Sequence, residues 1–484
     1  MADSLQAAPA PDVDVLIVGA GLSGIGAACR LRAEAPEADF ALLESRAASG
    51  GTWDLFRYPG VRSDSDMFTL GYDFRPWDGT TALAGGAEIL DYVRSTAAEY
   101  GVGERIEYGK RVTAADWSSA DRRWTTVTAH GETRSCRFLY LCTGYYRYDE
   151  GYRPDWPGTD DYTGTIVHPQ EWPEDLDVAG KRIVVIGSGA TAVTLVPALA
   201  RLGAHVTMLQ RSPSYVFSLP AHDAVAELFA KLLPRRAAYA AARWKNIKLS
   251  TAIYQLCQRH PERAKALLQG GVRRRLPAGY DVDTHFSPKY GPWDQRMCLV
   301  PDSDLFEAIR SGGAEVVTDH IETFTPSGLR LKSGAELDAD IIVTATGLNL
   351  LALGGIELSV DGEPVRIPEH VVYKGMMLDG VPNLVFALGY TNASWTLKVD
   401  LVSAFFVRLL RHMRSNALTT AVPRLPAAPV ATTPFIEMSS GYFERSRHLL
   451  PRQGEASPWR LHQHYRKDAR LLRGRVEDGA LDFS

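Results

Sequence analysis

The chain has 484 residues, of which 45% are hydrophobic, and its formal net charge at pH 7 is -4. This length and hydrophobic content predict two or three domains with buried cores, and they exclude a small binding module or a charged tail. The weakly acidic balance gives no electrostatic reason to expect a nucleic-acid partner, so we predict none.

The start of the chain lacks the charged residues and the long apolar run of a signal peptide. The apolar run from Val13 is also too short to cross a bilayer. We therefore predict a cytoplasmic location and no integral membrane segment. The cysteines number five, with no pair at Cys-x-x-Cys spacing, which argues against a disulfide framework or a zinc site. We expect buried thiols and no metal.

A strand, a glycine turn and a helix follow one another near the start of the chain. The apolar run Val13–Val18 predicts a strand, and the stretch 25–34 predicts a helix. Between them stand the glycines of a Gly-x-Gly-x-x-Gly motif: Gly19, Gly21 and Gly24. Such glycines bring backbone amides against a pyrophosphate at a helix N-terminus. A second predicted strand, 39–43, is followed by Glu44, at the spacing of an acid that binds ribose hydroxyls.

The same unit recurs in the middle of the chain. A predicted strand, 182–186, leads into the run Gly187, Ser188, Gly189, Ala190 and Thr191, which opens a predicted helix before the strand 205–209. This second unit ends in Arg211 and Ser212, where the first has Glu44. A carboxylate repels a 2′-phosphate, whereas a guanidinium binds one through paired hydrogen bonds. We therefore assign FAD to the first unit and NADP to the second. Taken alone, Arg211 would be an ordinary surface arginine.

A segment between the two units, 50–64, is rich in glycine and aromatic residues. It contains Gly51, Thr52 and Trp53 and ends at Asp64. Its glycines let backbone approach a flavin closely, its tryptophan can cover a ring face, and an acid such as Asp64 can hold a nearby cation. Taken alone, Asp64 would only cap a turn.

A third pattern stands immediately before the second glycine motif, in residues 162–173. Its residues are Tyr162, Gly164, His168, Trp172 and Pro173. Together with the Gly-Gly-x-Trp and aromatic-Pro-Gly-x-x-x-Asp patterns of 50–64, this string resembles the fingerprint of type I Baeyer-Villiger monooxygenases. Related N- and S-oxidising flavin monooxygenases usually carry Tyr or Phe in place of the tryptophan. Without those flanking motifs, the string would be a domain linker with a packed aromatic residue.

The resemblance spans most of the chain and is weakest over 221–283, and the C-terminal part is similar to the subgroup containing mycobacterial thioamide-prodrug activators. It implies that NADPH reduces FAD and that a C4a-peroxyflavin inserts one oxygen atom of O2 beside a ketone carbonyl. It also implies that Arg296 is the catalytic arginine and that Asp64 orients it. A permanently cationic guanidinium suits an anionic peroxide. Many members carry Lys before this arginine, where this chain has Gln295, so either the preference for NADPH is weaker or another cation substitutes.

The predicted fold class is α/β, with two Rossmann-like dinucleotide-binding domains and a helical insertion. We expect an FAD-binding domain formed by 1–150 and 346–484, an NADP-binding domain formed by 177–211 and 286–345, an interdomain linker at 151–176 and a helical insertion at 212–285. The loop that contains Asn392 and Trp395 is a predicted edge of the substrate pocket.

The predicted insertion is rich in alanine and arginine. Its plainest interpretation is a solvated set of helices, because charged faces commonly meet water. Its basic amphipathic character also permits peripheral membrane contact or a lid over the pocket.

Three other functions share some of these sequence features. A heteroatom monooxygenase would oxidise sulfides, thioamides or amines with the same cofactors, but Trp172 and Arg296 favour ketone attack. A non-catalytic flavin-binding sensor would bind both nucleotides without turnover, and Asp64 with Arg296 argues against it. A disulfide reductase is disfavoured because no redox cysteine pair follows the first glycine motif. The predicted partners are a small-molecule ketone or sulfide and O2.

Overall fold

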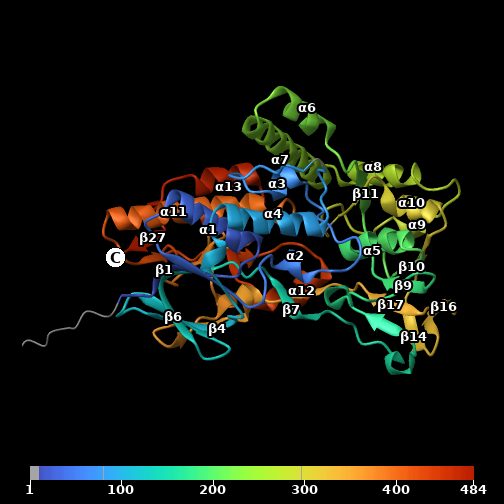
Figure 1. Ribbon diagram of the computed structural model, residues 1–484, viewed down its shortest axis with the longest axis horizontal. Helices are drawn as coiled ribbons and strands as arrows, with labels where there is room; N and C mark the ends of the chain where they lie inside the picture. Colours follow the sequence, from blue (N-terminus) through green and yellow to red (C-terminus); the bar gives the residue numbers. More distant parts are fainter. Residues whose placement is uncertain (1–9, 80, 296) are drawn as a thin grey trace, which may run out of the picture.

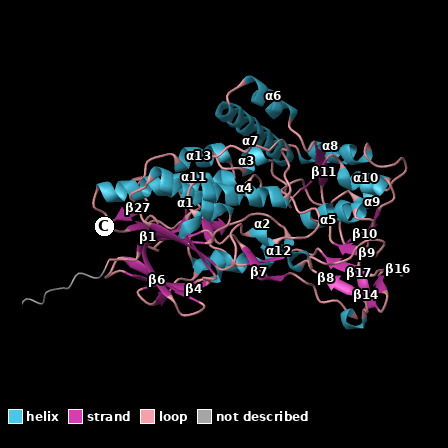
Figure 2. Ribbon diagram, in the orientation of Figure 1, coloured by secondary structure: helices cyan, strands magenta, loops and turns pink. Residues whose placement is uncertain are grey.

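Two separate sheets built around parallel strands carry the fold. The structure is a computed structural model, and it describes residues 10–79, 81–295 and 297–484. Within these residues the larger sheet has nine strands and the smaller parallel sheet has five. Figure 2 shows the two sheets toward opposite ends of the molecule, with helices along one side of both in this view. The predicted α/β class with two Rossmann-like units is confirmed.

The larger sheet combines strands from both ends of the chain. Its order is β20-β19-β4-β5-β6-β1-β2-β3, with β23 beside β6. The strands are β1 (Val13–Val18), β2 (Phe40–Glu44), β3 (Ile106–Tyr108), β4 (Val112–Ser118), β5 (Arg123–Thr128), β6 (Thr133–Leu141), β19 (Glu357–Val360), β20 (Glu363–Pro364) and β23 (Leu384–Phe386). Because β1 pairs in parallel with both β2 and β6, it lies inside the sheet, and Val15, Leu16 and Ile17 are fully buried.

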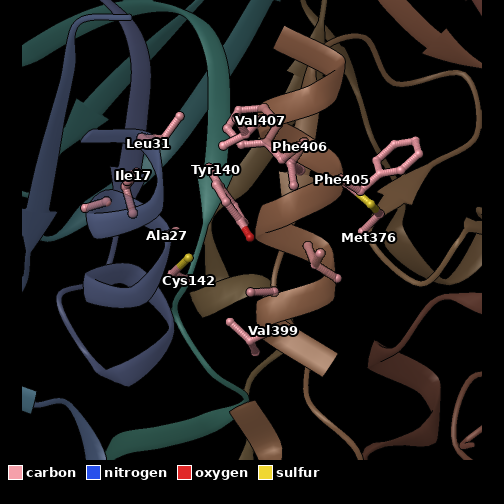
Figure 3. Packing of buried hydrophobic residues seen from close by; sticks show 14 of the residues in the cluster. Ile17, Ala27, Leu31, Tyr140, Cys142, Met376, Val399, Phe405, Phe406 and Val407 are labelled. Atoms are coloured by element: carbon pink, nitrogen blue, oxygen red, sulfur yellow. The ribbon is translucent and has the colours of Figure 1, made fainter. Parts of the chain in front are cut away.

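Three helices pack over this sheet: α1 (Leu22–Glu34), α4 (Gly86–Glu99) and α11 (Trp395–Ser415). Figure 3 shows Tyr140 of β6 beside Phe406 of α11, and their ring centroids are 5.0 Å apart. Both rings are fully buried, and the Tyr140 hydroxyl lies 3.0 Å from Oγ of Ser403. Burial of each ring stabilises the contact by roughly 1.5–3 kcal/mol, so the late helix α11 is held firmly on the early strand β6.

The smaller sheet has the order β13-β10-β9-β17-β8. Its strands are β8 (Thr165–Val167), β9 (Arg182–Ile186), β10 (His205–Gln210), β13 (Ala314–Thr318) and β17 (Ile341–Thr344). Helices α5 (Ala190–Arg201) and α10 (Asp304–Arg310) pack against it. Strand β8 lies within the stretch predicted as a linker, and it pairs in parallel with β17. That stretch therefore contributes an edge strand as well as a connection.

The first strands of both glycine units have the predicted bounds. The first helix, however, begins at Leu22 rather than at residue 25. The reason is that Gly24 lies inside the first turn, where an added Cβ would stand 1.9 Å from the carbonyl oxygen of Gly19. Only a residue without a side chain lets the helix begin this close to the turn.

Two segments cross between the sheets side by side. Strand β7 (Tyr146–Gly151) comes directly after β6 of the larger sheet along the chain, and β18 (Leu348–Leu350) comes directly after β17 of the smaller sheet. The two strands pair antiparallel.

The remaining strands form small sheets of two or three strands. They are β11 (Val216–Leu219) with β12 (Cys298–Pro301), β14 (Ile321–Thr325) with β15 (Gly328–Leu331) and β16 (Glu336–Asp338), β21 (Val372–Tyr373) with β22 (Met377–Leu378), β24 (Ala421–Pro423) with β27 (Leu481–Phe483), and β25 (Thr432–Pro434) with β26 (Arg452–Gly454). The short helices are α2 (Thr52–Leu55), α3 (Met67–Leu70), α9 (Val282–His285), α12 (Gly441–Ser446) and α13 (Tyr465–Leu472).

The segment 212–285 is mainly helical, as predicted, and its longer helices are α6 (Ala224–Leu232), α7 (Arg235–Arg259) and α8 (Pro261–Arg273). It also contains strand β11, which was not predicted. Figure 1 shows α6 and α7 as a hairpin that stands out from the rest of the molecule. Among the described helices, none is both long enough and apolar enough to cross a membrane.

The insertion is not wholly solvated, because one face of α7 packs against α3 and α11. Arg243 is buried there, and its guanidinium donates to the carbonyl oxygens of Phe68 (3.0 Å) and Gly71 (2.7 Å). It also donates to the carboxylate of Asp400 at 2.8 Å. These hydrogen bonds of a buried cation fix α7 against α3 and α11, which lie beside the larger sheet.

We predict that Arg243→Ala destabilises the protein by about 3 kcal/mol or more, because it leaves Asp400 buried beside fewer positive charges. Thermal unfolding, followed by circular dichroism, measures the loss. The matched control is Arg236→Ala, since Arg236 is exposed on the same helix. Equal melting temperatures for the two variants would contradict the role given to Arg243.

Candidate functional site

A cavity of about 570 Å³ lies between the two glycine motifs. Its volume falls in the range of small-molecule and cofactor sites. Ten of the residues predicted for the site line it: Gly19, Gly21, Glu44, Gly51, Thr52, Trp53, Asp64, Ala190, Thr191 and Trp395. The structure therefore brings parts of both nucleotide motifs to one space.

The first glycine turn is held tightly by the neighbouring strand end. Gly19 has φ of +104°, and a Cβ at this position would stand 2.6 Å from the carbonyl oxygen of Cys142. Helix α1 begins directly after the turn, with Gly21 as its N-cap and no side chain that caps it. Its first N–H groups are thus available to an anion at the cavity wall, which fits the pyrophosphate of a dinucleotide.

Glu44 ends β2 on the wall of the same cavity. Its Oε2 accepts a hydrogen bond from the backbone N–H of Ala20 at 2.7 Å, and its Oε1 accepts one from that of Arg46 at 2.9 Å. The side chain is buried at 4% exposure, so these bonds hold the carboxylate in place. A fixed acceptor beside the glycine turn suits the ribose hydroxyls of the predicted FAD.

The loop that contains Gly51 lies directly over the start of α1. A Cβ on Gly51 would stand 3.0 Å from Cα of Gly21. The hydroxyl of Thr52 lies 2.9 Å from that of Tyr148, and both residues line the cavity. Burial raises the pKa of Tyr148 to about 12, so this phenol stays protonated and can donate a hydrogen bond. Sequence reasoning missed Tyr148, because it comes from the crossing strand β7 and carries no motif.

Asp54 holds the loop that contains Gly51 in place through three arginines. Its carboxylate accepts hydrogen bonds from Arg46 (2.6 Å), Arg57 (2.9 Å) and Arg94 (2.7 Å). Burial acts to raise the pKa of Asp54, but the hydrogen bond and charge of Arg46 and the charges of the other two arginines lower it below its usual value. The carboxylate is therefore ionised at neutral pH, and it ties the loop to α4 through Arg94.

The second glycine turn repeats the geometry of the first. Gly187 has φ of +142°, and an added Cβ would stand 2.4 Å from the carbonyl oxygen of Ala345. Helix α5 begins at Ala190 with Gly189 as N-cap, and a Cβ on Gly189 would meet nothing within 4 Å. This turn is open, and the first N–H groups of α5 are available to an anion, which fits the pyrophosphate of a second dinucleotide.

Arg211 and Ser212 lie beside this second turn. Oγ of Ser188 donates to the carbonyl oxygen of Ser212 at 3.0 Å, which fixes the end of β10 against the turn. Arg211 is exposed, so its guanidinium is accessible to a phosphate. Neither Arg211 nor Ser212 lines the cavity, as expected of groups that would contact the outer end of a bound nucleotide.

The loop 58–64 joins the two halves at the cavity. Arg62 forms an ion pair with Asp304 of α10, with contacts of 2.5 and 3.3 Å, and both side chains are largely buried. Burial raises the pKa of Tyr58 to about 12, partly offset by a hydrogen bond with Thr191 of α5. Asp64 follows in the same loop and lines the cavity. Sequence reasoning missed Arg62, although it stands two residues before Asp64, because its partner is 242 residues away.

Arg296 lies outside the described residues, but its neighbours are fixed. The carbonyl oxygen of Asp294 accepts hydrogen bonds from the backbone N–H (3.1 Å) and Oγ (3.0 Å) of Ser439. The ring of Trp293 packs edge-on against Tyr254 of α7, with centroids 5.7 Å apart. Gln295 is only partly buried. The segment before Arg296 is therefore held by the insertion and by the C-terminal part of the chain.

The fingerprint residues lie away from the cavity, where the chain crosses between the sheets. His168 is 2% exposed and packs flat on Gly151. Its Nδ1 accepts from the backbone N–H of Gln170 at 3.2 Å, and its Nε2 lies 3.2 Å from the carbonyl oxygen of Gly347. Since Nδ1 accepts, Nε2 carries the proton and donates to Gly347. Gln170, which sequence reasoning missed, donates to the carbonyl oxygens of β7 at 2.9 and 2.7 Å.

The other fingerprint residues belong to the smaller half. The hydroxyl of Tyr162 donates to the carbonyl oxygen of Ala339 at 3.0 Å, and a Cβ on Gly164 would stand 2.3 Å from that hydroxyl. Trp172 packs on the core of the smaller half, whereas Pro173 is exposed. The fingerprint residues therefore pack where the chain passes between the two sheets, and none of their side chains lines the cavity.

Of the two residues predicted to form the edge of the substrate pocket, one lines the cavity and the other does not. Trp395 lines the cavity, and its Nε1 donates to Oγ of Ser23 at 2.8 Å, which joins α11 to the start of α1. Asn392 is not among the lining residues, and its amide nitrogen donates to the carbonyl oxygen of Gln463 at 2.9 Å. Tyr390 and Ala393 line the cavity from the same loop.

Comparisons with known proteins agree with this architecture. A family model described as Pyridine nucleotide-disulphide oxidoreductase matches residues 13–233. The chain is 55% identical over 477 residues to the FAD-containing monooxygenase EthA of Mycobacterium tuberculosis (strain ATCC 25618 / H37Rv), and the match covers 98% of each chain.

Two solved structures have the same fold. OTEMO in complex with FAD and NADP gives a TM-score of 0.77 at 21% identity and covers 98% of this chain and 100% of that one. The open structure of cyclohexanone monooxygenase gives a TM-score of 0.77 at 20% identity and covers 98% and 99%. At these identities the likeness concerns the fold alone.

We predict that His168 makes stability depend on pH. Burial lowers its pKa in the folded protein, although the hydrogen bond to Gly347 opposes this, so the unfolded chain takes up a proton that the folded chain does not. The stability that neutral His168 contributes is present above about pH 6.5 and is lost as the pH falls below it. His168→Gln keeps a donor but cannot titrate, so the melting-temperature difference between wild type and variant should shrink on acidification.

The matched control is His448→Gln, because His448 is exposed. Its difference from wild type should stay near zero across the same pH range. If the melting-temperature difference between wild type and His168→Gln did not change with pH, unfolding would not be coupled to proton uptake by His168.

Proposed function

Because this chain belongs to the FAD-containing monooxygenases, we propose that it is a Baeyer-Villiger enzyme that acts on a ketone. It is an NAD(P)H-dependent flavin monooxygenase. The proposal concerns the substrate atom that receives oxygen: one atom of O2 is inserted beside the ketone carbonyl and gives an ester or a lactone. We further propose the domain limits 1–150 with 346–484 for FAD and 177–211 with 286–345 for NADP, and a cytoplasmic location.

The observation that carries the proposal is the place of Asp64 on the wall of a cavity shared by both glycine motifs. An attacked ketone carbonyl develops negative charge on its oxygen, and a fixed guanidinium stabilises that charge. Under the proposal this cation is Arg296, and Asp64 keeps it oriented. Burial of the neighbouring Ser63 and the Arg62–Asp304 ion pair hold Asp64 in place.

The residues of the first half fit FAD. The open N-terminus of α1 would hold the pyrophosphate, Glu44 the ribose, and Gly51 with Trp53 the isoalloxazine ring. FAD, when bound, supplies the reaction with O2 that no side chain can perform. The protein supplies the position of the substrate and the exclusion of water, to which the rings of Trp53, Tyr390 and Trp395 on the cavity wall contribute.

The residues of the second half fit NADP. Gly187, Gly189 and the start of α5 would hold its pyrophosphate. Arg211 and Ser212 would bind the 2′-phosphate, because both are exposed beside the second turn. The nicotinamide would then reach the cavity past Ala190 and Thr191, which line it.

Sulfur or nitrogen oxidation is the nearest alternative, since the same cofactors serve it. A sulfide or a thioamide needs no cation for a developing oxyanion, so the Asp64 position favours the ketone. A flavin-binding sensor would not need an acid at a cavity shared by both nucleotide motifs. Disulfide reduction is disfavoured because each of the five cysteines is a buried, free thiol, and burial raises the pKa of Cys29 to about 12.

Turnover of a panel of ketones and sulfides under isotopically labelled O2, with mass analysis of the products, tests the substrate class. We expect one labelled oxygen atom in an ester or lactone from at least one ketone, with NADPH consumed in equal amount. Efficient sulfoxidation without ester from any ketone would reject the proposal in favour of heteroatom oxidation. NADPH oxidation that no substrate stimulates would favour the sensor.

We also expect Arg211→Ala to raise KM for NADPH roughly tenfold to 100-fold, because it removes a charge-assisted contact with the 2′-phosphate. KM for NADH should not change. Steady-state kinetics with both nucleotides measure this, and Lys181→Ala is the control, since Lys181 is exposed just before β9, at the opposite end of that strand from the glycine turn. An equal rise for NADH would assign Arg211 a structural role instead.

A further inference from the structure

Exposed large hydrophobic side chains are concentrated in the insertion. Of the eleven such side chains among the described residues, nine lie between positions 219 and 267. They are Leu219, Val225, Leu228, Leu232, Leu233, Trp244, Leu249, Leu256 and Leu267. Single exposed hydrophobic residues are common on protein surfaces, but a cluster in one segment marks an interaction surface.

Helix α6 turns its apolar side toward solvent. Val225, Leu228 and Leu232 are spaced by three and four residues, so they share one side of the helix, and they are 45%, 51% and 71% exposed. Ala226, on another side, is buried. The apolar side therefore does not pack on α7. Leu233 (40% exposed) directly follows α6, and α7, which packs on α6, exposes the ring of Trp244 (61%). We call these five residues the hairpin face.

The segment around the hairpin face is strongly basic. Residues 219–275 contain twelve Lys or Arg and three Asp or Glu, a net formal charge of +9, although the whole chain has -4. Several of these cations form no ion pair with another described residue: Lys231, Arg236, Lys248, Arg259, Arg263, Lys265 and Arg274. The ammonium of Lys248 lies 3.7 Å from the ring centroid of Trp244. A positive charge thus stands directly beside one of the exposed apolar side chains.

The hairpin is fixed with this face outward. Lys245 of α7 pairs with Asp223 at the start of α6, and Nδ2 of Asn246 donates to Oδ1 of Asp66 at 2.8 Å. Arg243 holds the same stretch of α7 on the larger half through Asp400. Figure 1 shows the hairpin protruding beyond the helices beneath it. The apolar residues therefore cannot turn inward without breaking buried polar contacts.

We propose that the hairpin face docks on a bilayer surface that contains anionic phospholipids. The leucines, the valine and Trp244 enter the boundary between headgroups and acyl chains, and the surrounding cations contact the lipid phosphates. Exposed leucines on a protruding amphipathic helix, with basic residues and a tryptophan beside them, match this surface. A second copy of the chain fits less well, because it would bring another set of these unpaired basic side chains against the first. The docking does not depend on which substrate the enzyme oxidises.

Cosedimentation of the full chain with vesicles tests the proposal. We expect binding to vesicles of equimolar phosphatidylcholine and phosphatidylglycerol, weaker binding to phosphatidylcholine alone, and weakening by added salt. The double substitution Leu228→Ser with Leu232→Ser should lower the partition coefficient on the order of tenfold or more. Lys231→Gln and Arg236→Gln should each lower it about fivefold.

The matched control is Leu202→Ser, since Leu202 is also 51% exposed but ends α5 in the smaller half. It should bind vesicles like the wild type, and all variants should keep the wild-type melting temperature. The proposal is overturned if the wild type does not bind anionic vesicles, or if the leucine pair and Leu202 have equal effects. It is also overturned if the leucine pair only changes a monomer–dimer equilibrium in sedimentation experiments, which would make a second copy the partner.

Discussion

The structure depends on two close contacts between backbone segments, one in each half. In each, a glycine with positive φ lies against the carbonyl oxygen of the residue that follows a neighbouring strand: Gly19 against Cys142 after β6, and Gly187 against Ala345 after β17. The N–H groups of the two glycines also donate to Leu43 and Leu209, both at 2.8 Å. Any side chain at either position would collide with that carbonyl and strain the backbone. These contacts place the open ends of α1 and α5 where a dinucleotide can meet them.

The second constraint is the relative orientation of the two glycine turns, which the segments between the two sheets determine. Each close contact involves a strand that returns from far along the chain, and directly after both strands the chain crosses to the other half as β7 or β18. His168 donates a hydrogen bond to Gly347, just before β18, and Gln170 donates to β7. On the cavity side, Arg62 and Asp304 form a largely buried ion pair. The fingerprint residues therefore hold the segments that cross between the two sheets, whereas the loop 58–64 forms part of the cavity wall.

The local units could be predicted from the sequence because their signals are short. Buried parallel strands are continuous apolar runs, and glycines mark turns. The two units differ where the second strand ends, since the first has Glu44 there and the second has Arg211. Ten of the predicted site residues share one cavity for this reason. The errors arose where packing decides the outcome: α1 begins earlier than its pattern indicates, β8 extends the smaller sheet, and α7 is partly buried through Arg243.

By itself the sequence determined the fold class, the two nucleotide motifs and the expected cofactors, since each of these depends on residues close together in the chain. Only the tertiary structure decided which side chains meet. Tyr148 with Thr52, Arg62 with Asp304, and Tyr140 with Phe406 join residues 96, 242 and 266 positions apart, and none belongs to a repeating pattern. Such pairs form because strands and helices pack to bury apolar surface, and the polar groups that reach the interior must then find partners wherever the packing leaves them. The outward apolar side of α6 follows from the same rule, because its helical pattern predicts an apolar side but not what that side contacts.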